Sequence, residues 1–546
     1  MERQAARKSD AGMRYDVVIV GAGFSGMYML HKCRQLGLSA VVLDAAGDVG
    51  GTWYWNRYPG ARCDIHSMDY SYSFDEDLQQ EWEWSERYSP QAEILSYVEH
   101  VAERFDLRRD IRFDSRVVSA SFDEDANLWR VVTQAGETWS GTYCVMAVGC
   151  LSLPQTPNFD GLEDFKGPWY HTGLWPHEGV DFTGLDVAVV GTGSSGMQSI
   201  PQIAKQARHL TVFQRTPNFA VPAWNHKLGE EEVSEIKDNY AAFRDYARWS
   251  ESGYNGEESH ESGHDVSQER RIAEFERRWA VGGFTVLSTF SDIGSDLEVN
   301  KMAAEFAHEK IRQRVKDPQV ADLLCPTNHP FGTKRLCVDI DYYETYNRPN
   351  VSLENLRVAP IEAITPDGLR TTEKDYKFDA IVFAIGFDAM TGPLLNIDIK
   401  GKGGQALREK WEEGPQSYLG LSVAGFPNLF TVTGPQSPSV MTNMMSAIEQ
   451  HVEWISDCLA YMQEHGHDRI EAGEKAEQEW VIHNGEVADT TLYPQADSWY
   501  VGANIEGKPR VILPYLGSFG EYRKTCDAIA AEGYRGFELD SADRAA

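Results

Sequence analysis

Two segments of the chain combine an apolar run, a glycine-rich turn and the beginning of a helix. The first apolar run leads into Gly21-Ala-Gly23-Phe24-Ser-Gly26, and the second leads into Gly191-Thr192-Gly193-Ser194-Ser195-Gly196. An apolar run of this length predicts a buried strand of a parallel sheet. The first glycine permits a tight bend, the second lets the backbone approach a pyrophosphate, and the third lets helix and strand pack closely. Each unit is therefore predicted to hold dinucleotide phosphates at a helix N-terminus.

The residue that ends the next strand differs between the two units. The run Ala40-Val-Val-Leu ends in Asp44, whose carboxylate can accept hydrogen bonds from both hydroxyls of an unmodified ribose. The run Leu210-Thr-Val-Phe is followed instead by Gln214, Arg215 and Thr216. An arginine fork without an acid suits a 2′-phosphate. The acid after the first unit and the arginine after the second together predict FAD in the first unit and NADPH in the second. The expected chemistry is hydride transfer from nicotinamide to flavin.

Three further apolar runs end in glycine and predict buried strands: 142–149, 378–386 and 428–434. A spacing of three and four between apolar residues predicts helices over 233–247, 303–315 and 446–463. The segment Ser250 to Ser267 is rich in Ser, Gly and Glu, and we expect it to be a mobile surface loop.

These elements predict an α/β fold of two Rossmann-like dinucleotide-binding domains, with a helical insertion in the second. A strand followed by Gly-Pro at 434–435 suits the edge of a nucleotide sheet, so the C-terminal portion is expected to complete the first domain. The expected bounds are 14–150 and 387–546 for the FAD-binding domain, 151–223 and 331–386 for the NADP-binding domain, and 224–330 for the insertion.

Composition narrows the class of protein. The chain has 546 residues, 42% hydrophobic and 25% charged, which excludes a disordered or collagen-like chain. A formal charge of -32 repels polyanions, so we expect no nucleic-acid partner, and an anionic ligand needs local cations.

Eight scattered cysteines without a CxxC pair predict free thiols in a reducing cytosol. Neither a secretory signal at Met1 to Met13 nor a membrane span is predicted, so a cytoplasmic location is expected. No metal site is predicted, because His260 and His264 lack a third ligand.

A longer motif lies between the two glycine turns. The segment Phe165-Lys-Gly167-Pro-Trp-Tyr-His171-Thr-Gly-Leu-Trp175-Pro176 fits the pattern FxGxxxHxxxW followed by proline. It resembles the fingerprint of type I Baeyer-Villiger monooxygenases. The same resemblance runs through Gly50 to Asp64, through Gly332-Thr-Lys334-Arg335 and through Ser498 to Asn504, and it spans residues 14–540.

This resemblance implies an FAD- and NADPH-dependent enzyme that inserts one oxygen atom of O2 next to a ketone carbonyl. The product is an ester or lactone, formed through a C4a-peroxyflavin and a Criegee adduct. Arg335 is similar to the family's catalytic arginine, which stabilises the peroxy anion and the oxyanion of the adduct. Asp64 matches the carboxylate that orients that guanidinium. Lys334 is similar to a 2′-phosphate ligand that works with Arg215 and Thr216, and Trp499 to a tryptophan on a mobile loop over the nicotinamide.

The resemblance also implies the remaining cofactor contacts. They are Thr52, Trp53, Trp55, Asp64, Tyr70, Val117 and Met444, beside the two glycine turns, Asp44 and Arg335. His171 is expected to have a structural role in linking the domains, and residues 436–443 are expected to lie near the flavin. The family's Ala-Thr-Gly turns read Ala-Val-Gly149 and Ala-Ile-Gly386 here. His66 lies where many relatives carry an acid. If its side chain faces the site, it is expected to change the local charge and the pH dependence of the activity. Neither the ketone nor the oligomeric state is predicted.

Three other functions share some of these features. Flavin-containing monooxygenases that oxidise N or S atoms share both glycine turns, but they have a shorter FxGxxxH motif and usually lack the Gly-Thr-Lys-Arg segment and the insertion. Disulfide reductases need a reactive cysteine pair, which the chain does not have. A nucleotide-sensing module without activity would leave Asp64 and Arg335 without a purpose.

Overall fold

The computed structural model describes residues 14–541, so the segment from Met1 to Met13 lies outside the described residues. The first sheet has the strand order β17-β4-β5-β6-β1-β2-β3, with β18 also paired to β6. Its strands are β1 (Arg14–Val20), β2 (Ala40–Leu43), β3 (Ile111–Arg112), β4 (Val117–Asp123), β5 (Leu128–Thr133), β6 (Thr138–Met146), β17 (Asp398–Lys400) and β18 (Leu429–Thr431).

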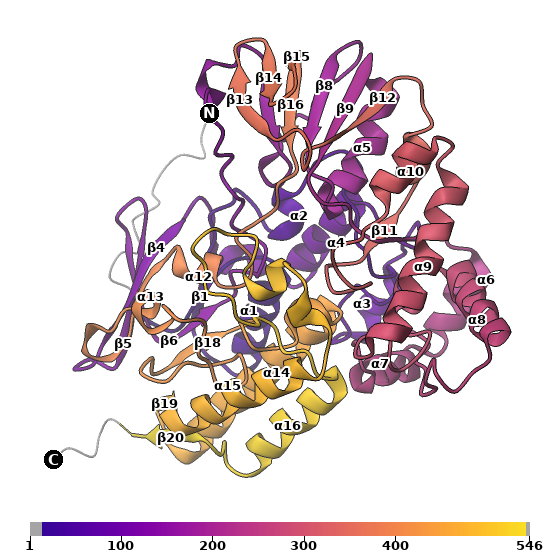
Figure 1. Ribbon diagram of the computed structural model, residues 1–546. Helices are drawn as coiled ribbons and strands as arrows, with labels where there is room; N and C mark the ends of the chain where they lie inside the picture. Colours follow the sequence, from indigo (N-terminus) through magenta and orange to yellow (C-terminus); the bar gives the residue numbers. More distant parts are fainter. Residues whose placement is uncertain (1–13, 542–546) are drawn as a thin grey trace.

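Strand β6 connects two parts of this sheet. Residues 138–141 pair antiparallel with β5, whereas residues 144–146 pair in parallel with β18. Figure 1 shows the orange β18 beside the purple β6, so a strand from late in the chain joins a sheet built from its beginning. The predicted strand at 428–434 therefore belongs to the first sheet.

The second sheet is entirely parallel, in the order β12-β9-β8-β16-β7. Its strands are β7 (Trp169–His171), β8 (Asp186–Val190), β9 (His209–Gln214), β12 (Val351–Asn355) and β16 (Ala380–Phe383). Smaller sheets are formed by β10 (Ala220–Pro222) with β11 (Cys337–Asp339), by β13 (Ile361–Thr365), β14 (Gly368–Thr371) and β15 (Asp375–Lys377), and by β19 (Arg469–Ala472) with β20 (Phe537–Asp540). A mixed sheet with a parallel core and a second, entirely parallel sheet confirm the predicted α/β class.

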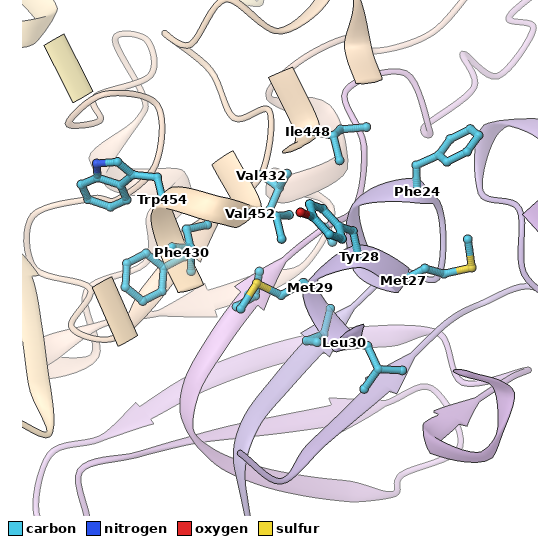
Figure 2. Close-up of a cluster of buried hydrophobic side chains, with 14 of the residues drawn as sticks. Phe24, Met27, Tyr28, Met29, Leu30, Phe430, Val432, Ile448, Val452 and Trp454 are labelled. Carbon is cyan, nitrogen blue, oxygen red and sulfur yellow. The ribbon is translucent and has the colours of Figure 1, made fainter. Parts of the chain in front are cut away.

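The helix after the first glycine turn is buried on nearly every side. Helix α1 (Phe24–Gln35) packs against α14 (Met444–His465) and against the strand β18 region, and Figure 2 shows Met29 and Tyr28 of α1 near Phe430 and Val452. Met27, Met29 and Leu30 are fully buried. Each such side chain contributes about 1.5–3 kcal/mol through removal from water. This packing fixes the helix N-terminus at the end of β1.

The remaining helices lie outside the predicted insertion. They are α2 (Thr52–Trp55), α3 (Glu76–Glu81), α4 (Gln91–Arg104), α5 (Ser194–Gln206), α11 (Tyr342–Thr345), α12 (Gly392–Leu395), α13 (Leu407–Lys410), α15 (Glu474–Asp489) and α16 (Phe519–Ala531). No helix within residues 14–541 is long and apolar enough to cross a membrane.

The helical insertion forms a group on the right of Figure 1. It contains α6 (Glu230–Lys237), α7 (Tyr240–Trp249), α8 (Gln268–Val281), α9 (Leu297–Arg314) and α10 (Pro318–Leu324). The prediction of one helix over 233–247 is wrong, because the helix is interrupted at Asp238 and Asn239. Asn239 leaves the helical region, with φ -127, and its side chain donates to Glu235 O at 3.1 Å. Such local side-chain bonds compete with the helix.

The segment Ser250 to Ser267 is non-helical, as predicted, but its first part is anchored. The side-chain hydroxyls of Thr442 and Ser446 donate to the carbonyls of Ser252 and Gly253, each at 2.6 Å. The backbone N and the side-chain amide of Asn255 donate to Asp69 at 2.9 and 2.8 Å. This part of the loop is therefore hydrogen-bonded to distant residues, and composition does not reveal such partners.

Candidate active site

The first glycine turn is fixed by close backbone contacts. A Cβ atom at Gly21 would lie 2.4 Å from the carbonyl oxygen of Ala147, and Gly21 has φ +106. A Cβ at Gly26 would lie 1.7 Å from the carbonyl oxygen of Gly21. The Ala-Val-Gly149 turn therefore packs directly on the glycine turn even without the family's threonine. At Gly23 a Cβ would lie 3.4 Å from the Cα of Gly51, so two glycines face each other there.

Asp44 follows β2 and lies at the base of this turn. Its carboxylate accepts hydrogen bonds from the backbone N of Ala22 and, at 2.7 Å, from that of Ala46. Burial raises the pKa of Asp44, and these hydrogen bonds oppose the rise. Each carboxylate oxygen has a second lone pair, so a ribose hydroxyl can still be accepted. Val117 begins β4 nearby, two residues after Ser115, whose N donates to Asp44 O at 2.7 Å.

Aromatic side chains from three predicted positions meet beside the turn. The ring of Tyr70 lies 5.8 Å from that of Phe24 and 5.9 Å from that of Trp53, edge to face in both cases. Trp53 Nε1 also donates to the Tyr70 hydroxyl at 3.2 Å. Thr52 and Trp55 lie on the same short helix as Trp53, and Met444 packs against the same core as Phe24. Phe24, Trp53 and Tyr70 are thus in direct contact beside the first glycine turn.

Arg335 and Asp64 form a bidentate ion pair. Arg335 Nε and Nη2 donate to the two carboxylate oxygens of Asp64 at 2.8–3.0 Å. Arg335 Nη1 donates to the carbonyl of Val440 at 2.8 Å, and the Phe284 ring lies 4.8 Å from the guanidinium carbon. Burial works against the charged guanidinium, but Asp64 and Tyr500 outweigh it, so the pKa of Arg335 is raised. The guanidinium is therefore a permanent cation in a fixed orientation.

Tyr500 is a site residue that the sequence analysis missed. Its buried side chain lies against Arg335; burial raises its pKa to about 12, and Arg335 opposes the rise. Its ring packs on Trp499 at 4.3 Å. The neighbouring Asp497 accepts a hydrogen bond from Lys334 Nζ at its carbonyl. The segment that carries Trp499 therefore contacts both basic residues of the Gly-Thr-Lys-Arg motif. In the sequence, the position of Tyr500 next to Trp499 was the only indication that it belongs to the site.

The second glycine turn repeats the geometry of the first. A Cβ at Gly191 would lie 2.3 Å from the carbonyl oxygen of Ala384, and one at Gly196 2.3 Å from the carbonyl oxygen of Gly191. A Cβ at Gly193 would meet nothing within 4 Å, so this side of the turn is open. The side chains of the turn have partners of their own: Thr192 with Thr216 O at 3.1 Å, Ser194 with Cys337 at 3.4 Å and Ser195 with Thr172 at 3.0 Å.

The predicted cations lie close to this turn. Arg215 follows β9, is exposed and forms no ion pair within the part of the chain that the structure describes. Burial lowers the pKa of Lys334, Asp497 raises it, and Arg215 and Arg357 lower it further. Arg215 and Lys334 do not contact each other directly. The positive charge of Arg215 nevertheless acts on Lys334, so the two cations lie in the same region.

His66 does not contact Arg335. Its Nε2 lies 3.0 Å from the Tyr88 hydroxyl and 3.1 Å from Arg87 Nε. Burial, followed by the charges of Arg87 and His226, lowers the pKa of His66 to about 3. The ring is therefore neutral near pH 7, and the expected effect of His66 on the pH response loses its physical basis.

We expect His66→Gln to leave the pH profile of kcat/KM unchanged between about pH 6 and pH 9, because neither side chain changes charge there. The stability of the protein should respond instead. The unfolded histidine takes up a proton near pH 6.5 and the folded one near 3, so wild-type stability falls as pH decreases through this window. Chemical unfolding of the variant should show a shallower loss. A pH profile displaced by the substitution would contradict the assignment.

Comparison with known proteins places this geometry in a family. The family description "Flavin-binding monooxygenase-like" matches residues 14–225. A protein from Pseudooceanicola batsensis named Baeyer-Villiger monooxygenase is 42% identical over 98% of both chains. The chain belongs to the Baeyer-Villiger monooxygenases. The resemblance inferred from the sequence motifs is thereby confirmed.

Two further proteins are similar to this Baeyer-Villiger monooxygenase over nearly its whole length. The structure described as "Oxidized steroid monooxygenase bound to NADP" has a TM-score of 0.93 and 50% identity, with 96% of this chain and 99% of that chain covered. A phenazine N-monooxygenase from Lysobacter antibioticus is 42% identical over 96% of this chain and 97% of its own. One relative that is similar over its full length is therefore named for the oxidation of a nitrogen atom. A substrate panel for this protein should for that reason contain an N-heterocycle as well as ketones.

Proposed function

We propose that Arg335 and Asp64 are the catalytic pair of a monooxygenase that inserts one oxygen atom of O2 next to a ketone carbonyl, giving an ester or lactone. The observation that carries this proposal is the bidentate, anchored ion pair, which holds a permanent positive charge in one place. Such a preorganised charge stabilises an oxyanion that develops as oxygen adds to the carbonyl. Asp64 fixes one edge of the guanidinium and Val440 a further nitrogen, so the charge needs no reorganisation during the reaction.

The residues around the first turn fit FAD, and those around the second fit NADPH. The facing glycines at 23 and 51 leave a strip of bare backbone for a pyrophosphate, and Asp44 can hold a ribose. Gly193 is open, and Arg215, Thr216 and Lys334 supply the partners of a 2′-phosphate. When bound, the two cofactors supply the electrons and the O2 chemistry of the reaction. The segment that carries Trp499 contacts Lys334 through the carbonyl of Asp497 and Arg335 through Tyr500.

The partners that we propose are a small ketone and O2. The eight cysteines are free and buried, which supports the proposed cytoplasmic location. The apolar residues Val440 and Met441 lie in the segment next to Arg335, so an apolar ketone suits this site better than a charged one.

We expect Arg215→Ala to raise the KM for NADPH by about 10-fold while leaving the KM for NADH unchanged, because a charge-assisted hydrogen bond to the 2′-phosphate is lost. Steady-state kinetics with both nucleotides measure this. Equal losses for NADPH and NADH would mean that Arg215 does not contact the 2′-phosphate.

Product mass under 18O2 tests the function itself. The FAD-loaded enzyme is incubated with NADPH and a panel of a cyclic ketone, a steroid ketone, an aryl ketone and phenazine. We expect an ester or lactone that carries one 18O atom. Labelled phenazine N-oxide with no labelled ester from any ketone would overturn the proposal in favour of nitrogen oxidation.

A further inference from the structure

The strand register brings another arginine to the second nucleotide site. Strands β12 and β9 run in parallel, with Asn355 paired to Gln214. The residues that follow both strands therefore meet at the same edge of the sheet, where ligands of such folds bind. Arg357 follows β12, and its Nε donates to the carbonyl of Arg215 at 2.9 Å. Its Nη2 lies 3.4 Å from the hydroxyl of Thr216.

The charge at this edge is not balanced by a facing carboxylate. Arg357 is exposed, and neither it nor Arg215 forms an ion pair with any residue between 14 and 541. Both arginines lower the pKa of Lys334. Asp497, the acid whose charge acts on Lys334, is paired with Arg510 at 2.7 Å. Like charges held together repel one another. On a chain with a net charge of -32, an unpaired cluster of cations indicates a site for an anion.

A buried histidine at the same edge points to a ligand independently. His329 is 8% exposed, and its Nδ1 lies 3.1 Å from Asn328 Oδ1. Its Nε2 is buried and has no hydrogen-bond partner among the described residues. Burial, Lys334 and Arg357 together lower the pKa of His329 to about 4, so the ring is neutral beside these cations. Buried polar atoms without a partner are rare and often belong to a ligand site.

We propose that Arg357 is a further ligand of the 2′-phosphate of NADPH and that it sets the preference for NADPH over NADH together with Arg215 and Lys334. The inference rests on the proposed NADPH site. The guanidinium keeps its backbone bond to Arg215 O through Nε and offers its two terminal nitrogens to the phosphate. A planar fork of this kind suits a phosphate oxygen pair better than an ammonium does.

Direct binding to the FAD-loaded enzyme tests the proposal without turnover. Calorimetric titration compares 2′,5′-ADP with 5′-ADP, which lacks the 2′-phosphate. We expect Arg357→Gln to weaken 2′,5′-ADP binding by about 10-fold and to leave 5′-ADP binding unchanged. The dependence of 2′,5′-ADP affinity on salt should become shallower, because fewer charges face the phosphate. Arg357→Lys should recover part of the lost affinity.

Arg370→Gln is the matched control. Arg370 is an exposed arginine on β14, in another sheet. It is paired with Asp375 at 2.7 Å, and its substitution changes the net charge by the same amount. We expect it to leave both affinities unchanged. Thermal unfolding of each variant checks that the loop after β12 is still folded.

The outcomes separate the inference from the function on which it rests. If Arg357→Gln binds 2′,5′-ADP like the wild type while Arg215→Ala loses affinity, Arg357 is not a ligand and the NADPH site stands. If neither substitution changes 2′,5′-ADP binding, the NADPH site itself is wrong. Equal losses for 2′,5′-ADP and 5′-ADP in Arg357→Gln would overturn the inference, since they indicate a structural role.

Discussion

Arg335→Ala should reduce ester formation by about 10³-fold or more, while NADPH still reduces the flavin at a wild-type rate. Removing one donor that stabilises a developing oxyanion costs about 10²–10³-fold in kcat. Here the substitution removes a full charge and also leaves the carboxylate of Asp64 without its bidentate partner. Anaerobic stopped-flow reduction and the yield of labelled ester measure the two half-reactions separately. NADPH consumption in air should continue and end in hydrogen peroxide.

Arg335→Lys is the matched control for charge. An ammonium keeps the positive charge, but it cannot bind both oxygens of Asp64 and the carbonyl of Val440 at once. We expect an ester yield between those of the wild type and the alanine variant. An alanine variant with a wild-type yield would remove Arg335 from the mechanism, and a loss of flavin reduction in the same variant would indicate damage to cofactor binding.

Gly26→Ala should prevent stable FAD binding. Its Cβ would lie 1.7 Å from the carbonyl oxygen of Gly21, a backbone atom that cannot move aside without opening the turn. Overpacking of this kind costs about 3 kcal/mol or more, and it displaces the helix N-terminus that faces the pyrophosphate. The ratio of flavin absorbance to protein, together with the unfolding temperature, measures the effect. We expect a colourless protein of lowered unfolding temperature.

Gly193→Ala is the control at the second turn. Its Cβ would meet nothing within 4 Å, and its φ of -77 suits any residue. We expect full FAD content, an unchanged unfolding temperature and weaker binding of NADP+, because the methyl group enters the open side of the turn. Stoichiometric FAD in Gly26→Ala would show that the first turn adapts, and it would contradict the close contact as the reason for glycine there.

Features that depend on neighbours in sequence were predictable. The glycine turns, the strands before them and the acid or arginine after the next strand follow one another within a few tens of residues. Their spacing alone therefore indicates a pair of nucleotide-binding units. The Arg335 and Asp64 pairing came from the family resemblance, because no local pattern connects them. The break at Asn239 and the anchoring of Ser252 were missed, since apolar spacing and composition do not report side-chain hydrogen bonds to backbone groups.

The sequence by itself determined the fold class, the family and the two cofactors, FAD and NADPH. The tertiary structure decided which distant side chains share a site. Tyr500 reaches Arg335 because its loop folds over the Gly-Thr-Lys-Arg motif, and Arg357 reaches Thr216 because β12 pairs with β9 in one register. It also placed His66 against Tyr88 and Arg87. The physical reason is common to all three. Hydrogen bonds and charges act over a few ångströms in space, and the packing of whole sheets sets those distances.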